Sequence, residues 1–155
     1  MISRKERTAA EVSAWLVEKG AAPEEVEAIV ERLTSLQLLD DERFAVLYTE
    51  DKRNLAGWGS ERIERTLIER GIPSEVARQA VSDGTDEDVE RAISVLVERG
   101  SDLEDERDRQ RALGLLARRG YSSEDAYEAI RRLRKGRTGG NGRGSDLPSD
   151  TSRSR

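Results

Sequence analysis

The sequence predicts an all-α protein made of tandem three-helix repeats that form an elongated, curved array. Three glycines, each preceded by a basic residue, recur at separations of 51 and 49 residues: Gly20, Gly71 and Gly120. Equivalent apolar residues precede each glycine by four and by eight positions, the spacing of one helix face: Leu16, Leu67 and Leu116, and Val12, Ile63 and Ala112. Glycine enters the left-handed conformation that ends a helix at little cost, so each repeat reads as helix, glycine, helix.

The first repeat, residues 1–39, is expected to be truncated to two helices. A capping box from Thr8 to Glu11 opens a helix that runs to about residue 19. Pro23, followed by two glutamates, starts a second helix that ends near Leu36. The helix that opens the later repeats has no counterpart here.

The second repeat, residues 40–84, is predicted to hold three helices. Asp40 caps the first of them, Ser60 caps the second, and Pro73 starts a short third that ends at Gly84. Aromatic and leucine side chains at helical spacing give the first of these helices one apolar face.

The third repeat, residues 85–134, follows the same plan. Asp86 opens its first helix and Gly100 ends it, an acidic linker leads to a helix that ends at Arg119, and Ser122 caps a last helix to about residue 134. Residues 135–155 have no apolar periodicity and are dominated by Gly, Ser, Thr, Asn and Pro. They are predicted to form a disordered basic tail.

The charge is distributed unevenly. The whole chain carries a net charge of −5, but residues 131–155 hold eight basic side chains against two acids, a local +6 that leaves −11 on residues 1–130. A basic terminal segment can attract nucleic acid or an acidic protein. Basic residues at a helix C-terminus also interact favourably with its dipole. Both interpretations apply to Arg131, Arg132, Arg134 and Lys135.

The composition excludes several classes of chemistry. The chain contains no Cys and no His, so Cys/His zinc sites, thiolate chemistry and a Ser-His-Asp triad are ruled out. No metal, cofactor or enzymatic activity is expected. The sequence has no long apolar run, so we expect a cytoplasmic protein, monomeric and without membrane contact.

The middle helices of the second and third repeats carry basic residues at matched positions. With Ile63 and Leu67 turned inward, an ideal helix places the opposite-face positions of these repeats in one basic strip: Arg62, Arg65, Arg107, Arg111 and Arg118. Such a strip suits phosphates or acidic protein loops. The alternative is a solvated face of a highly charged protein. Trp58, between two glycines, is interpreted as a lid over an inter-helix joint or as an exposed stacking platform.

Three motifs in order resemble the RecX family, bacterial regulatory proteins that modulate the RecA recombinase. They are residues 39–45 (LDDERFA), residues 57–72 (GWGSERI with Leu67 and Arg70-Gly71-Ile72), and residues 113–122 (LGLLARRGYS). The resemblance covers roughly residues 8–134. It implies a protein that lies in the groove of a RecA filament on DNA and inhibits strand exchange, ATP hydrolysis and coprotease activity, thereby modulating DNA repair, recombination and the SOS response.

The resemblance maps the positively charged face of the family onto the basic strip, with Lys52 and Arg53 as outlying candidates. The chain departs from the family pattern in its missing opening helix and in its acidic body. Two other functions stay open: a sequence-tolerant DNA-binding protein that acts without RecA, and a helical-repeat scaffold that binds proteins.

Overall fold

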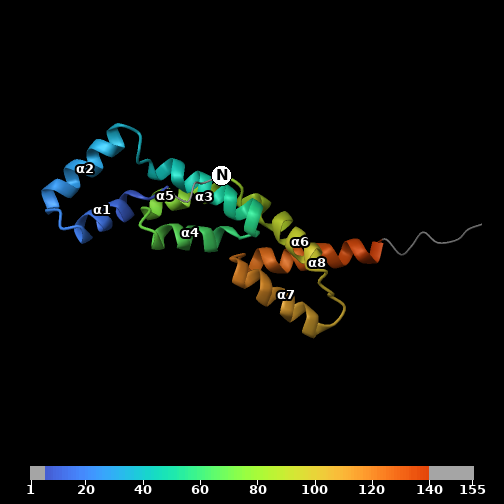
Figure 1. Ribbon diagram of the computed structural model, residues 1–155. Coiled ribbons are helices and arrows are strands. Elements are labelled where there is room, and N and C mark those ends of the chain that lie inside the picture. The colour runs from blue at the N-terminus through green and yellow to red at the C-terminus, as the bar shows by residue number, and fades with distance from the viewer. Residues whose placement is uncertain (1–5, 140–155) are drawn as a thin grey trace, which may run out of the picture.

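The computed structural model describes residues 6–139, which form an elongated array of helices (Figure 1). Among these residues there is no β-strand, and no helix is both long and apolar enough to cross a membrane. The helices are α1 (Ala9–Glu18), α2 (Pro23–Ser35), α3 (Asp41–Ala56), α4 (Ser60–Glu69), α5 (Ser74–Ser82), the short 3-10 helix η1 (Thr85–Glu87), α6 (Asp88–Glu98), α7 (Glu106–Arg119) and α8 (Ser123–Gly139).

The helices form three successive groups, which we call unit 1 (α1 and α2), unit 2 (α3 to α5) and unit 3 (α6 to α8). In unit 2, α5 packs against both α3 and α4; in unit 3, α8 packs against both α6 and α7. Units 2 and 3 each enclose their own apolar cluster. The first is formed by Phe44, Ala45, Tyr48, Ile63, Leu67, Ile72, Ala77 and Val81, and the second by Ala92, Val95, Leu96, Leu103, Ala112, Leu116, Tyr121, Ala126, Ala129 and Ile130.

Most predicted helix starts are confirmed by their caps, with two exceptions. Asp86 does not open the first helix of unit 3, because it lies within the 3-10 helix η1 and α6 begins at Asp88. Thr8 forms the capping box with Glu11, and the Asp40 carboxylate accepts from the amide of Arg43 at 3.1 Å. Ser60 does not cap α4, contrary to the prediction. The N-cap position is Gly59, and the Ser60 hydroxyl instead accepts a hydrogen bond from Arg53. The first amides of α4 therefore find acceptors elsewhere.

The last helix is longer than its sequence predicts. It was expected to end near residue 134, but α8 continues to Gly139. The guanidinium of Arg137 donates to the carbonyl of Ser101 at 3.2 Å, which fastens the final turns to the loop before α7. This contact acts against the roughly 1 kcal/mol cost of Gly136 inside a helix. The predicted disorder of residues 135–155 is therefore wrong for residues 135–139, which are helical, and residues 140–155 lie outside the described residues.

The middle helices of units 2 and 3 are joined end to end. The amides of Gly59 and Glu61 at the start of α4 donate to the carbonyls of Arg119 (2.8 Å) and Gly120 (3.2 Å) at the end of α7. The amide of Ser60, between them, donates to the Asp88 carboxylate of unit 3 at 3.3 Å. The positive end of the α4 dipole thus lies on the negative end of the α7 dipole.

This approach of two backbones requires glycine on both sides. A Cβ at Gly59 would lie 2.4 Å from the carbonyl oxygen of Gly120, and a Cβ at Gly120 would lie 2.2 Å from the Cβ of Arg62. Gly120 also has a φ of 93°, which L side chains rarely adopt. The pair Gly59 and Gly120 therefore sets the distance between units 2 and 3.

Units 1 and 2 are joined in a similar way. The Thr8 hydroxyl at the start of α1 donates to the carbonyl of Arg70 at the end of α4 (2.8 Å), and the Arg70 guanidinium pairs with Glu11 at 2.8 Å. A Cβ at Gly71 would come 2.3 Å from the Cβ of Ala10. We call the head-to-tail series α1, α4 and α7, along the lower edge of Figure 1, the middle-helix column.

We predict that Gly59→Ala lowers the free energy of unfolding by about 1 to 3 kcal/mol, because the backbone must shift to admit the methyl group. The φ of Gly59 is −82°, so alanine suffers no conformational penalty there and the loss reports the steric clash alone. Gly136→Ala is the control, since nothing lies within 4 Å of its Cβ position and the loss of a helical glycine should raise the stability by about 1 kcal/mol. Urea denaturation of both variants measures the difference, and equal midpoints would show that the two units do not dock as described.

A second prediction compares equivalent leucines of units 1 and 2. Leu67 is fully buried, so Leu67→Ala should cost about 2 to 5 kcal/mol through the cavity it leaves. Leu16, its counterpart in α1, is only half-buried, and Leu16→Ala should cost less. Thermal unfolding of the two variants tests the order, and a larger loss at Leu16 would contradict it.

Candidate partner-binding surface

The middle-helix column brings the arginines of the predicted strip onto consecutive helices. Arg65 lies on α4, whereas Arg107, Arg111 and Arg118 lie on α7. The three α7 positions fall within about 40° of one another around an ideal helix. Because α7 ends where α4 begins, the basic residues follow one another along the column. Arg107 and Arg118 lie about 16 Å apart along the axis of α7.

Four members of the strip have exposed guanidinium groups. Arg65, Arg107 and Arg118 are exposed, and their side chains form no hydrogen bond or ion pair with the described part of the chain. Arg111 is 65% exposed and approaches Asp108 at 3.5 Å, a long contact that solvent weakens further.

Arg62, the fifth member, does not project freely from the packing, and the expectation that it does is wrong. Its guanidinium lies 3.8 Å from the centre of the Trp58 ring and donates to the carbonyl of Arg118 at 3.0 Å. Its Cβ lies over Gly120. Arg62 therefore belongs to the joint between units 2 and 3.

Trp58 lies between two cations at the same joint. The Lys52 ammonium is 4.6 Å from its ring centre, and Arg62 is the second cation. Trp58 is partly buried against the unit 2 cluster. These contacts favour the interpretation of Trp58 as a lid over that of an exposed stacking platform. They also place the Lys52 ammonium against Trp58.

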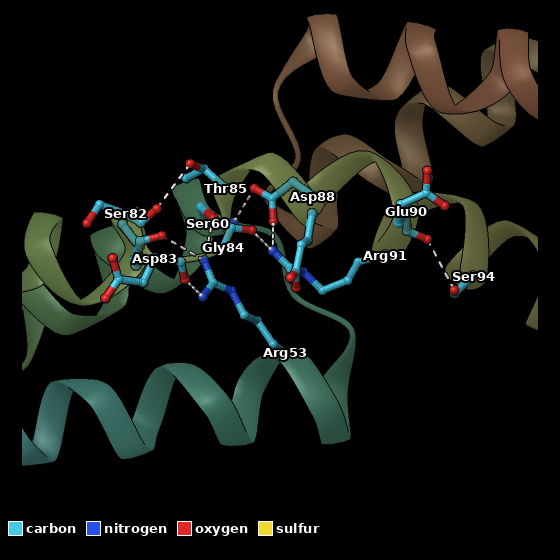
Figure 2. A network of polar contacts seen from close by, with 12 residues as sticks. Arg53, Ser60, Ser82, Asp83, Gly84, Thr85, Asp88, Glu90, Arg91 and Ser94 are labelled. Atoms are coloured by element: carbon cyan, nitrogen blue, oxygen red, sulfur yellow. Dashed lines mark hydrogen bonds and ion pairs between the residues drawn. The ribbon is translucent and has the colours of Figure 1, made fainter.

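Arg53 lies inside a polar network at the boundary of units 2 and 3, which Figure 2 shows from close by. Its guanidinium donates to the carbonyls of Val81 (2.8 Å) and Asp83 (2.7 Å) and to the Ser60 hydroxyl (2.9 Å). Burial, followed by the neighbouring charge of Arg91, lowers the pKa of Arg53. The geometry gives Arg53 a structural role, as a cap on the last carbonyls of α5.

Asp88 and Arg91 complete this network and were not singled out by the sequence. Asp88 is buried, and its carboxylate accepts from Arg91 at 2.6 Å as well as from the amide of Ser60. Arg91 also donates to the carbonyl of Gly84. The spacing of Asp88 and Arg91, three apart on one helix, was the available signal, but it is equally common on exposed helix surfaces.

The basic residues of α8 are exposed at the far end of the array. Arg131 pairs with Glu128 at 2.6 Å, and Arg132 pairs with Glu128 and Glu90. Arg134 and Lys135 are exposed. A groove of about 970 Å³ opens between α7 and α8, with an apolar floor that includes Leu113 and Ile130 and a rim that includes Arg131, Arg134, Lys135 and Arg137.

Comparison with known proteins finds similarity to one family. A family model described as "RecX, second three-helix domain" matches residues 40–81, which comprise α3, α4 and most of α5. The Regulatory protein RecX of Mycolicibacterium vanbaalenii is 33% identical over 91 residues, covering 59% of this chain and 49% of the relative. Residues 40–81 thus match the second three-helix domain of the RecX family, and the chain is similar to regulatory proteins of that family over more than half of its length.

Other relatives and solved structures agree with this assignment. The Regulatory protein RecX of Listeria welshimeri is 28% identical over 86 residues, 56% of this chain and 32% of the relative. A crystal structure of RecX from Lactobacillus salivarius superposes with a TM-score of 0.77 at 24% identity, covering 85% of this chain and 88% of that one. A crystal structure of a regulatory protein RecX gives a TM-score of 0.71 at 27% identity, covering 83% and 65%.

These matches support a regulatory protein with the RecX fold. The curated relatives carry the name of a regulatory protein rather than of an enzyme. The matched segments span about half the length of the M. vanbaalenii relative and about a third of the L. welshimeri relative.

The joint beside the basic strip also contains a titratable group. The Tyr121 hydroxyl donates to the carbonyl of Gly57 at 2.8 Å, and Arg119 donates to the carbonyl of Ala56, so unit 3 holds the end of α3. Burial, with a smaller effect of Asp88, raises the pKa of Tyr121 from 10.0 to about 12.

We therefore predict an alkaline loss of stability that depends on Tyr121. A folded-state pKa above the unfolded value means that the stabilisation is complete below pH 10 and is lost as pH rises towards 12. Tyr121→Phe removes the ionisable group, so its unfolding free energy should fall less steeply across that window. Denaturant melts at several alkaline pH values measure the two slopes, and parallel slopes would show that Tyr121 ionises as freely as an exposed tyrosine.

Proposed function

We propose that this protein binds RecA filaments assembled on DNA, lies in their helical groove, and inhibits RecA recombinase, ATPase and coprotease activities. Similarity to regulatory proteins of the RecX family carries this proposal. Acting on RecA would make the protein a modulator of DNA repair, recombination and the SOS response, and we propose that it does so as a monomer in the cytoplasm.

The exposed charge of units 2 and 3 supports the proposal. Arg65, Arg107, Arg111 and Arg118 follow one another along the middle-helix column, and an elongated column suits the helical groove of a filament. Guanidinium groups form paired hydrogen bonds with carboxylates and phosphates alike. We therefore assign the contact with RecA and DNA to these four arginines, with Arg131, Arg132, Arg134 and Lys135 extending the surface at the far end. The joint beneath this surface contains the other predicted residues, Arg62, Arg53 and Lys52.

The acidic start of the chain suggests that unit 1 contributes least to contact with DNA. At the positions of unit 1 that match Arg62, Arg65 and Glu69, α1 carries Glu11, Ala14 and Glu18. Direct DNA binding without RecA is the second candidate function, favoured by the unpaired arginines of α4 and α7. It predicts tight binding to bare DNA with a steep dependence on salt.

The main test of this proposal measures the rate of DNA-dependent ATP hydrolysis by the cognate RecA with and without this protein. Substoichiometric protein should slow ATP hydrolysis, because one molecule bound in the groove or at an end affects more filament subunits than it touches. Fluorescence anisotropy with bare single-stranded DNA, measured in parallel, separates this function from direct DNA binding. An unchanged rate of ATP hydrolysis by RecA at excess protein would contradict the proposal.

We predict that Arg65→Glu combined with Arg118→Glu raises the protein concentration for half-inhibition roughly tenfold, because two charge-assisted contacts become repulsive. Unlike Arg62, these residues take no part in the joint through their side chains, so the melting temperature should stay near that of wild type. The matched control is Arg78→Glu with Arg99→Glu, which makes the same change in net charge at an exposed position of α5 and at the exposed C-cap of α6. Equal inhibition by both double variants at physiological salt would show that the strip is only a solvated surface.

A further inference from the structure

The last helix is longer than its counterparts in the other units. The α8 helix has 17 residues, whereas α2 has 13 and α5 has 9. Its additional turns run beside the loop that precedes α7, because Arg137 donates to the carbonyl of Ser101. Figure 1 shows α7 and α8 diverging towards this end of the array. The groove of about 970 Å³ between them therefore depends on the extension of α8, which the repeat plan does not supply.

Both helices turn one face into this groove. The lining residues of α8 recur at intervals of three or four, the spacing of one helix side: Tyr127, Ile130, Arg131, Arg134 and Thr138. Those of α7 recur in the same way: Glu106, Arg109, Gln110 and Leu113. The face of α8 extends over about 16 Å along the helix axis, which is long enough for about three turns of a bound helix.

The floor of the groove is apolar. Leu103 and Ile130 are buried beneath it, and Leu113 is half-buried. Tyr127, which also lines the groove, is 61% exposed. Leu113 and Tyr127 thus present apolar surface to solvent, and an apolar side chain bound there would remove this surface from water.

The α8 wall of the groove is basic. Arg134 and Lys135 are exposed, and their side chains form no ion pair within the described part of the chain. Arg137 is exposed as well and donates to a backbone carbonyl, which does not neutralise its charge. Arg131 is the exception on this wall, because it pairs with Glu128 at 2.6 Å.

The α7 wall has mixed charge. The Glu106 carboxylate accepts from Gln110 at 2.8 Å and from Arg109 at 2.9 Å, and Glu104 is exposed beside them. Those hydrogen bonds lower the pKa of Glu106, with a smaller contribution from the charge of Arg134 on the opposite wall. Five basic and two acidic side chains line the groove, a net charge of +3, which becomes +2 when the neighbouring Glu128 is included.

This division of charge favours an acidic peptide over nucleic acid. A phosphate backbone is negative along its whole length, so it would lie against Glu104 and Glu106 and leave the apolar floor uncovered. A peptide can direct its carboxylates to the α8 wall and its apolar side chains to the floor. Residues 140–155 of the chain carry three arginines and two aspartates, so their net charge does not complement the groove.

We propose that the groove between α7 and α8 binds an acidic segment of a partner protein. Apolar side chains of this segment would cover Leu113 and Tyr127, and its carboxylates would pair with Arg134, Lys135 and Arg137. The proposal goes beyond binding to RecA filaments and does not rest on it, because peptide binding to the groove requires neither RecA nor DNA.

A synthetic peptide with both properties makes a suitable probe. It has about twelve residues, about 18 Å as a helix, with leucines every three or four positions, glutamates along one side of them and a fluorescent label. One control peptide has glutamine in place of every glutamate, and the other has serine in place of every leucine. Fluorescence anisotropy with the full chain should show saturable 1:1 binding of the probe. Either control should bind at least about tenfold more weakly, a difference of about 1.4 kcal/mol.

Variants of the protein locate the binding. Arg134→Gln with Lys135→Gln should weaken binding of the probe by about tenfold or more, because two charge-assisted contacts are lost. Arg78→Gln with Arg99→Gln is the matched control, since it makes the same change in net charge at exposed positions outside the groove and should bind like wild type.

A second variant tests the apolar part of the groove without a change in charge. Tyr127→Ser should weaken binding of the probe about fivefold or more, because apolar surface is lost. Val97→Ser is its control, since Val97 is 55% exposed on α6 and does not line the groove. All four residues of the two groove and charge variants pairs are exposed, and circular dichroism checks that each variant remains helical.

Four results would overturn the proposal. The first is no saturable binding of the probe, and the second is binding that Arg134→Gln with Lys135→Gln leaves unchanged. The third is tighter binding of an oligo-dT strand than of the probe, lost in the same double variant, which would make nucleic acid the ligand. The fourth is a dimer in sedimentation velocity that this double variant dissociates, which would make a second copy of the chain the occupant.

Discussion

The array depends on one interaction: the first backbone amides of α4 donate hydrogen bonds to acceptors in unit 3. Every helix leaves its first amides without partners inside the helix. In α4 the N-cap residue is Gly59, which has no side chain to accept them, and the acceptors come from Arg119, Gly120 and Asp88. The start of α4 is therefore complete only when unit 3 is docked, which couples the two units in folding as well as in position.

The same docking divides the basic residues into two groups. Those near the joint, Arg53 and Arg62, satisfy carbonyls or stack on Trp58 and so hold units 2 and 3 together. Those one or more turns away from it, such as Arg65 and Arg107, keep their guanidinium groups in solvent. Sequence spacing alone places both groups on one strip, although their surroundings in the protein differ.

Local features of the sequence predict the eight α-helices of the described residues, but not the 3-10 helix η1, the start of α6 or the end of α8. The positive φ of Gly20, Gly71 and Gly120 and the caps at Thr8 and Asp40 follow from residues within one helical turn, so they can be recognised without knowledge of the fold. Features that join distant segments were not predictable. Ser60 contacts Asp88 across 28 residues and Arg62 contacts Arg118 across 56, and no local pattern specifies such partners. The end of α8 was not predictable for the same reason, because Arg137 near that end donates to the carbonyl of Ser101, 36 residues away.

The head-to-tail series of α1, α4 and α7 gives the protein a direction. All three middle helices point the same way, so their peptide dipoles add along the array instead of cancelling as they do in antiparallel bundles. The two ends consequently differ: one presents the carbonyls around Gly20, and the other presents the start of α7, capped by Asp105. A partner whose own subunits are oriented, as in any polar polymer, would meet two distinguishable ends. Reversing the molecule on such a partner would therefore exchange the end of α1 for the acid-capped start of α7.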